Sequence, residues 1–120
     1  MPDLKEKGIA LLSSTSVDMK TAASTTLYTV PVGKVCYISR IVVRDYTASL
    51  AGGTDYDFTN YRQTVNLSAH TTANTGYASI DPTDNTEYVE TAAGVAIQIT
   101  VNTGSTSACT ATIDLFGYLV

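Results

Sequence analysis

The chain has 120 residues, of which 44% are hydrophobic and 15% are charged, and its formal net charge is −4. This length suits one domain with a real core and is too short for two, and so acidic a balance argues against a nucleic-acid groove, which needs a basic face. No apolar run approaches the ~20 residues of a membrane-spanning helix, and the charged start lacks the apolar region of a secretion signal. We therefore expect a single domain over residues 1–120, made in the cytoplasm, with residues 1–7 as a flexible arm.

The first part of the chain predicts two strands and a loose connection between them. Residues 8–13 form a short apolar segment that predicts the first strand. The Ser/Thr-rich stretch that follows has weak helical character over residues 18–23 and predicts an irregular connection. Residues 26–30 predict a second strand, and Pro31 and Gly33 then favour a tight turn, because proline fixes one backbone torsion and glycine relaxes another. We interpret this turn as a hairpin-like junction to the next strand.

The run over residues 35–45 is the longest β-rich segment. Its apolar side chains stand first at Cys36 and Ile38 and then at Ile41 and Val43. Because successive side chains of a strand point to opposite faces, this change of parity within the run predicts a β-bulge near Ser39 or Arg40.

Further strands are predicted over residues 54–59, 61–67 and 77–80, with a polar loop over 68–76 and a strong turn signal over 81–85. The last two strands have the clearest alternation of apolar and polar residues, over residues 95–101 and 109–115. Since exposure of an apolar end to water is unfavourable, we expect the final strand to lie inside a sheet, which would make truncation there destructive.

About eight strands with one apolar face each predict an all-β fold. Threonine is abundant and β-branched, which favours strands over helices. In an antiparallel, jelly-roll-like β-sandwich, each sheet covers the apolar face of the other. Because pairing cannot be read from one sequence, immunoglobulin-like and barrel arrangements stay open as alternatives.

The residues that could carry chemistry are few. His70 is the single histidine and stands in a polar loop without a neighbouring nucleophile, so we expect a solvent-facing side chain and no catalytic triad. No glycine-rich phosphate loop is present. Asp45, Asp55 and Asp57 are a weak candidate set for a calcium site, since calcium takes oxygen ligands. The sequence predicts a protein that is not an enzyme, needs no cofactor and binds no small-molecule substrate.

The two cysteines and the eight tyrosines are expected in different places. Cys36 and Cys109 are expected to be small buried hydrophobes, with a disulfide between them as the alternative. The sequence contains eight tyrosines and no tryptophan. The tyrosine side chain combines an apolar ring with a polar hydroxyl, which suits contact surfaces between proteins. The tyrosines near predicted strand ends or loops are the candidate interface residues; they are Tyr46, Tyr56, Tyr61, Tyr77 and Tyr88.

Three segments resemble a known group of proteins. Residues 27–34 read LYTVPVGK, the run after them ends in IVVRD over residues 41–45, and the chain closes with ATIDLFGYLV over residues 111–120. These segments resemble the opening and the closing strand of small β-sandwich proteins encoded by tailed bacteriophages. The resemblance extends over most of the chain from Leu27 onward, and its motifs mark a turn and a terminal strand.

The resemblance implies a structural virion protein with a jelly-roll-like fold, most often a capsid decoration (cement) protein or a head or tail accessory protein. It implies a homotrimer that contacts the major capsid protein or other virion proteins, and it carries over no catalytic residue. The alternative is a carbohydrate- or receptor-binding module of a phage tail or host-attachment apparatus, which would use exposed tyrosines and the aspartate-rich strand.

Overall fold

The computed structural model describes residues 9–73, 76–80 and 89–120, and all of its regular structure is β-strand. The described part of the chain holds no helix that could cross a membrane. Its strands are β1 (Ala10–Asp18), β2 (Ser24–Thr29), β3 (Cys36–Arg44), β4 (Asp55–Phe58), β5 (Arg62–Val65), β6 (Tyr77–Ile80), β7 (Val89–Thr91), β8 (Ala96–Thr103) and β9 (Thr110–Leu119).

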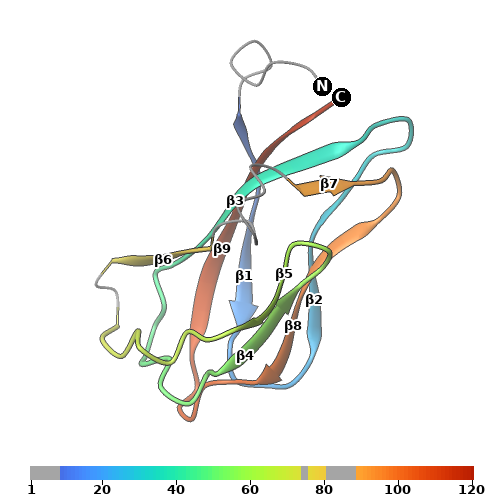
Figure 1. Cartoon of the computed structure of the whole chain (residues 1–120). Helices are drawn as coiled ribbons and strands as arrows, with labels where there is room; N and C mark the ends of the chain where they lie inside the picture. The colour runs from blue at the N-terminus through green and yellow to red at the C-terminus, as the bar shows by residue number, and fades with distance from the viewer. Residues whose placement is uncertain (1–8, 74–75, 81–88) are drawn as a thin grey trace.

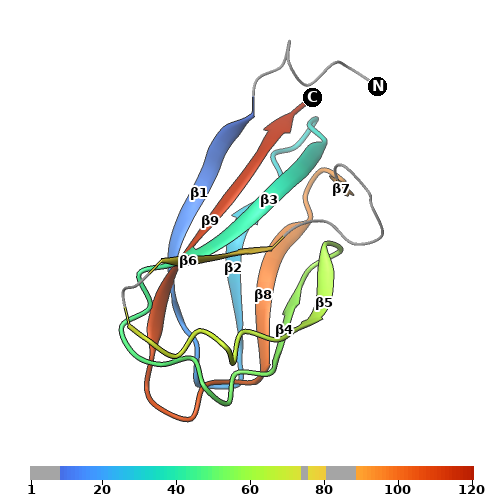
Figure 2. The same cartoon turned by 60° about the vertical axis from the view of Figure 1, so that its left-hand side comes forward.

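These strands form two antiparallel sheets that face each other (Figures 1 and 2). One sheet has the order β1–β9–β3–β6, with β7 also paired to β3, and the other has the order β2–β8–β4–β5. β6 pairs with residues 41–44 of β3 and β7 with residues 36–38, so the two occupy successive stretches of one edge of β3.

The pairing is nested about the middle of the chain. β4 pairs with β5, β3 with β6 and β7, β2 with β8, and β1 with β9. If β6 and β7 are counted as one interrupted strand, this is the wrapping of an eight-stranded jelly roll. The predicted all-β, jelly-roll-like sandwich is therefore confirmed.

The core lies between the sheets and follows the alternation of the sequence. In β8, Ile97, Ile99 and Val101 are buried, and in β9 Ile113 and Leu115 oppose them from the other sheet. Burying branched side chains on one face of each strand supplies most of the driving force for folding, at about 25 cal/mol per Å² of apolar surface.

The cysteines are part of this core, as predicted. Cys36 and Cys109 are both buried and both free, so they form no disulfide. Burial raises the pKa of the Cys36 thiol to about 11, which keeps it protonated at neutral pH.

β9 lies between β1 and β3, which confirms that the last strand is internal. The predicted bulge in β3 is also confirmed, because the register against β9 shifts between Ile38 and Arg40. Here the backbones approach closely: a Cβ on Gly117 would overlap the carbonyl oxygen of Tyr37. Glycine at this position allows β9 to pass the bulge.

Two expectations for the first part of the chain are wrong. The Ser/Thr-rich stretch is not a loose connection with helical character, because β1 runs on to Asp18. The Asp18 carboxylate then accepts hydrogen bonds from the backbone N–H groups of Lys20 (2.9 Å) and Thr21 (3.2 Å), which closes a turn and lowers the pKa of Asp18. An aspartate that bonds the backbone two residues on favours a turn over a helix.

The turn at residues 31–34 forms, but it does not make a hairpin. The Lys34 N–H donates to the Pro31 carbonyl at 3.1 Å, and Gly33 has a φ of 79°. However, β2 and β3 belong to different sheets. The turn therefore carries the chain from one layer of the sandwich to the other, a crossing that local turn residues cannot distinguish from a hairpin.

Candidate functional site

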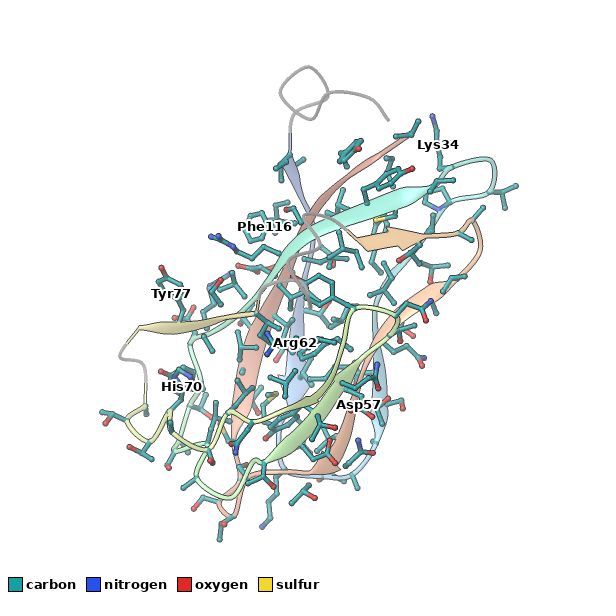
Figure 3. All side chains as sticks on the ribbon, viewed as in Figure 1. Lys34, Asp57, Arg62, His70, Tyr77 and Phe116 are labelled. Carbon is teal, nitrogen blue, oxygen red and sulfur yellow. The ribbon has the colours of Figure 1, made fainter. Side chains whose placement is uncertain are left out.

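An open cleft of about 290 Å³ lies between β5 and β6. β5 is the edge of one sheet and β6 is an edge strand of the other, so the cleft opens along one side of the sandwich. Figure 3 shows Arg62, His70 and Tyr77 around this region. The polar and aromatic residues that line the cleft are Arg62, Asn66, His70, Tyr77 and Ser79.

The two sides of the cleft are tied together at one point. The hydroxyl of Tyr61, next to β5, donates to the carbonyl oxygen of Ile80 in β6 at 2.6 Å, and this bond is buried. A buried hydrogen bond of this kind helps to fix the separation of the two edges, because losing a buried hydrogen bond is costly.

The loop at residues 66–70 forms the remaining wall. The Asn66 side-chain oxygen accepts bonds from the Ser68 N–H (2.9 Å) and hydroxyl (2.6 Å), while the His70 carbonyl accepts from the Leu50 N–H at 2.9 Å. The His70 ring meets the Tyr46 ring edge-on, with centroids 6.0 Å apart. His70 stands in a loop, as expected, but it is half-buried and only partly faces solvent, because its ring packs against Tyr46.

β5 contains a strained residue beside this cleft. Thr64 has a φ of 53°, a value that β-branched residues rarely adopt. Residues 63 and 64 together stand opposite Asp57 of β4, and the Asp57 carboxylate accepts a bond from the Thr64 N–H at 2.8 Å. The arrangement is a β-bulge that the Asp57 side chain holds in place.

We expect Thr64→Gly to raise the free energy of unfolding by about 0.5–1 kcal/mol, because glycine adopts a positive φ without steric cost. Gln63→Gly is the matched control on the same strand and is expected to lower stability by a similar amount. Urea unfolding of both variants checks this. A Thr64→Gly variant that is less stable than the wild type would contradict the backbone strain at Thr64.

The predicted calcium ligands do not come together. Asp55 and Asp57 lie on β4, where the Asn102 amide donates to both carboxylates, at 3.2 and 2.9 Å. Asp45 lies after β3 in the other sheet and pairs with Arg44 at 2.5 Å. Within residues 9–73, 76–80 and 89–120 no three His, Cys, Asp or Glu residues are grouped so as to hold a metal. The cation hypothesis is therefore wrong for these residues.

Three of the five candidate interface tyrosines are in the core, which corrects the prediction. Tyr46, Tyr56 and Tyr61 are 2%, 0% and 4% exposed. The Tyr56 hydroxyl donates to the Met19 carbonyl at 2.8 Å, and burial raises the pKa of Tyr56 to about 12. A tyrosine can be buried when its hydroxyl finds such a partner.

Tyr77 differs from these three tyrosines. Tyr77 is 64% exposed, as a contact residue must be, and it lines the cleft. Tyr88 lies outside the described residues. Whether Tyr77 contacts another molecule stays a prediction.

A polar network crosses the outer face of the β1–β9–β3 sheet. Asp114 of β9 is only 7% exposed. It accepts a bond from the Ser14 hydroxyl of β1 and, at 2.7 Å, one from the Arg44 Nε of β3. Burial by itself raises the pKa of Asp114, but the hydrogen bonds from Arg44 and Ser14 and the Arg44 charge outweigh it, so the pKa lies below its ordinary value.

Exposed apolar side chains gather at one end of the sandwich. Ile9 (48% exposed), Leu11 (52%), Val32 (95%) and Val120 (40%) lie at the end formed by the start of β1, the β2–β3 turn and the finish of β9 (Figure 1). Leu11 stands directly opposite the half-buried Phe116. We call Ile9, Leu11, Val32, Phe116 and Val120 the apolar end. Sequence patterning missed it because these residues come from three separate segments.

No family model, curated protein or solved structure matches the chain. The sequence resemblance to bacteriophage virion proteins therefore stays a prediction.

Proposed function

We propose that the protein is a structural component of a virus particle, a capsid decoration protein that works by contacts between subunits and with the shell. The apolar end is the observation that carries this proposal. Four large apolar side chains left in water at one end of a small domain are typical of a surface that another protein covers.

The neighbouring edge of the sheet supports the same role. β1 is a nine-residue edge strand, and among its residues only Asp18, at its end, is charged. Sheet edges of monomers are commonly protected by lysine, by proline, by shortness or by a β-bulge, and β1 has only the last of these, a register shift between Leu11 and Ser13. Among the described residues no strand pairs with the outer edge of β1, and such an edge suits pairing with a second copy of this chain.

Self-association agrees with the expected mode of action. A homotrimer presents the same apolar surface three times, and a shell with repeated sites then binds all three subunits together. Multivalent binding of this kind makes weak individual contacts sufficient, by factors of about 10²–10⁴ in affinity. The major capsid protein is the proposed shell partner.

The experiment is a light-scattering measurement of solution mass, followed by co-sedimentation of the same sample with phage capsids. We expect a mass of about three times the 12.7 kDa of the chain and its recovery with the shells. Leu11→Lys is expected to yield monomers that no longer pellet, because three ammonium groups would be desolvated in the contact.

Thr103→Lys is the matched control, since Thr103 is an exposed strand residue at the opposite end of the sandwich. It is expected to leave mass and pelleting unchanged. A wild-type chain that stays monomeric at high concentration and does not pellet would overturn the proposal.

A further inference from the structure

We draw no further inference here: the strongest candidate, the surface patch on the outer face of the β1–β9–β3 sheet where the half-buried ring of Tyr37 stacks on Tyr118 beside Phe116, carries no proposal because nothing in the described part of the chain shows what covers it.

Discussion

Gly117→Ala is expected to lower the free energy of unfolding by about 3 kcal/mol, a large fraction of the stability of a small domain. The new Cβ would overlap the carbonyl oxygen of Tyr37 and also approach the backbone of Ile38. These are main-chain atoms at the β3 bulge, and they cannot move without breaking the pairing of β3 with β9. Chemical unfolding of the purified variant measures the effect.

Gly33→Ala is the matched control. Gly33 has a φ of 79°, but a Cβ there would meet no atom within 4 Å. Only the backbone strain of a left-handed residue remains, which costs roughly 1–2 kcal/mol. Equal losses for the two variants would mean that the close approach at Gly117 contributes nothing, contrary to the geometry.

Asp114→Asn is expected to lower the free energy of unfolding at pH 7 by about 2 kcal/mol, since hydrogen bonds to a charged group are worth about 1.5–3 kcal/mol. Asp114 joins β1 to β3 through Ser14 and Arg44, and the substitution replaces its carboxylate by a neutral amide. Asp45→Asn is the control, because Asp45 pairs with the same arginine but its side chain is 62% exposed. Exposed ion pairs contribute only about 0–1 kcal/mol.

The pH dependence of this effect has a definite sign. The folded-state pKa of Asp114 lies below its ordinary value, so the unfolded chain takes up the proton first as the pH falls. The stabilisation is complete above the unfolded pKa of about 4 and is lost as the pH drops through the folded pKa. The difference between wild type and Asp114→Asn should therefore shrink below about pH 4 in urea titrations. A constant difference down to pH 2 would contradict the assignment.

Alternation and parity in the sequence predicted much of the fold. The regular alternation over residues 95–101 and 109–115 predicted two half-buried strands, and the parity change between Ile38 and Ile41 predicted the bulge. Both signals are local, because each depends only on which face of one strand is covered. The extension of β1 through serines and threonines was missed, since its partner β9 stabilises it and lies about 100 residues away.

The candidate site was harder to predict because it depends on distant contacts. Tyr56 and Tyr61 were expected at a surface, yet their hydroxyls donate to the backbone carbonyls of Met19 and Ile80. No pattern in the sequence identifies which tyrosines will find such acceptors. The cleft likewise combines β5, the 66–70 loop and β6, and their side chains meet only when two sheet edges are brought together.

The nested pairing has a consequence for how the chain folds during synthesis. β9 leaves the ribosome after all the other described strands, and both β1 and β3 need it as a neighbour. Until it emerges, their apolar faces and backbone groups lack the native partner, so the first sheet can assemble only after translation reaches the end of β9. Long-range pairing of this kind slows folding to about milliseconds or seconds. The nascent chain is therefore most open to aggregation or chaperone binding just before β9 emerges.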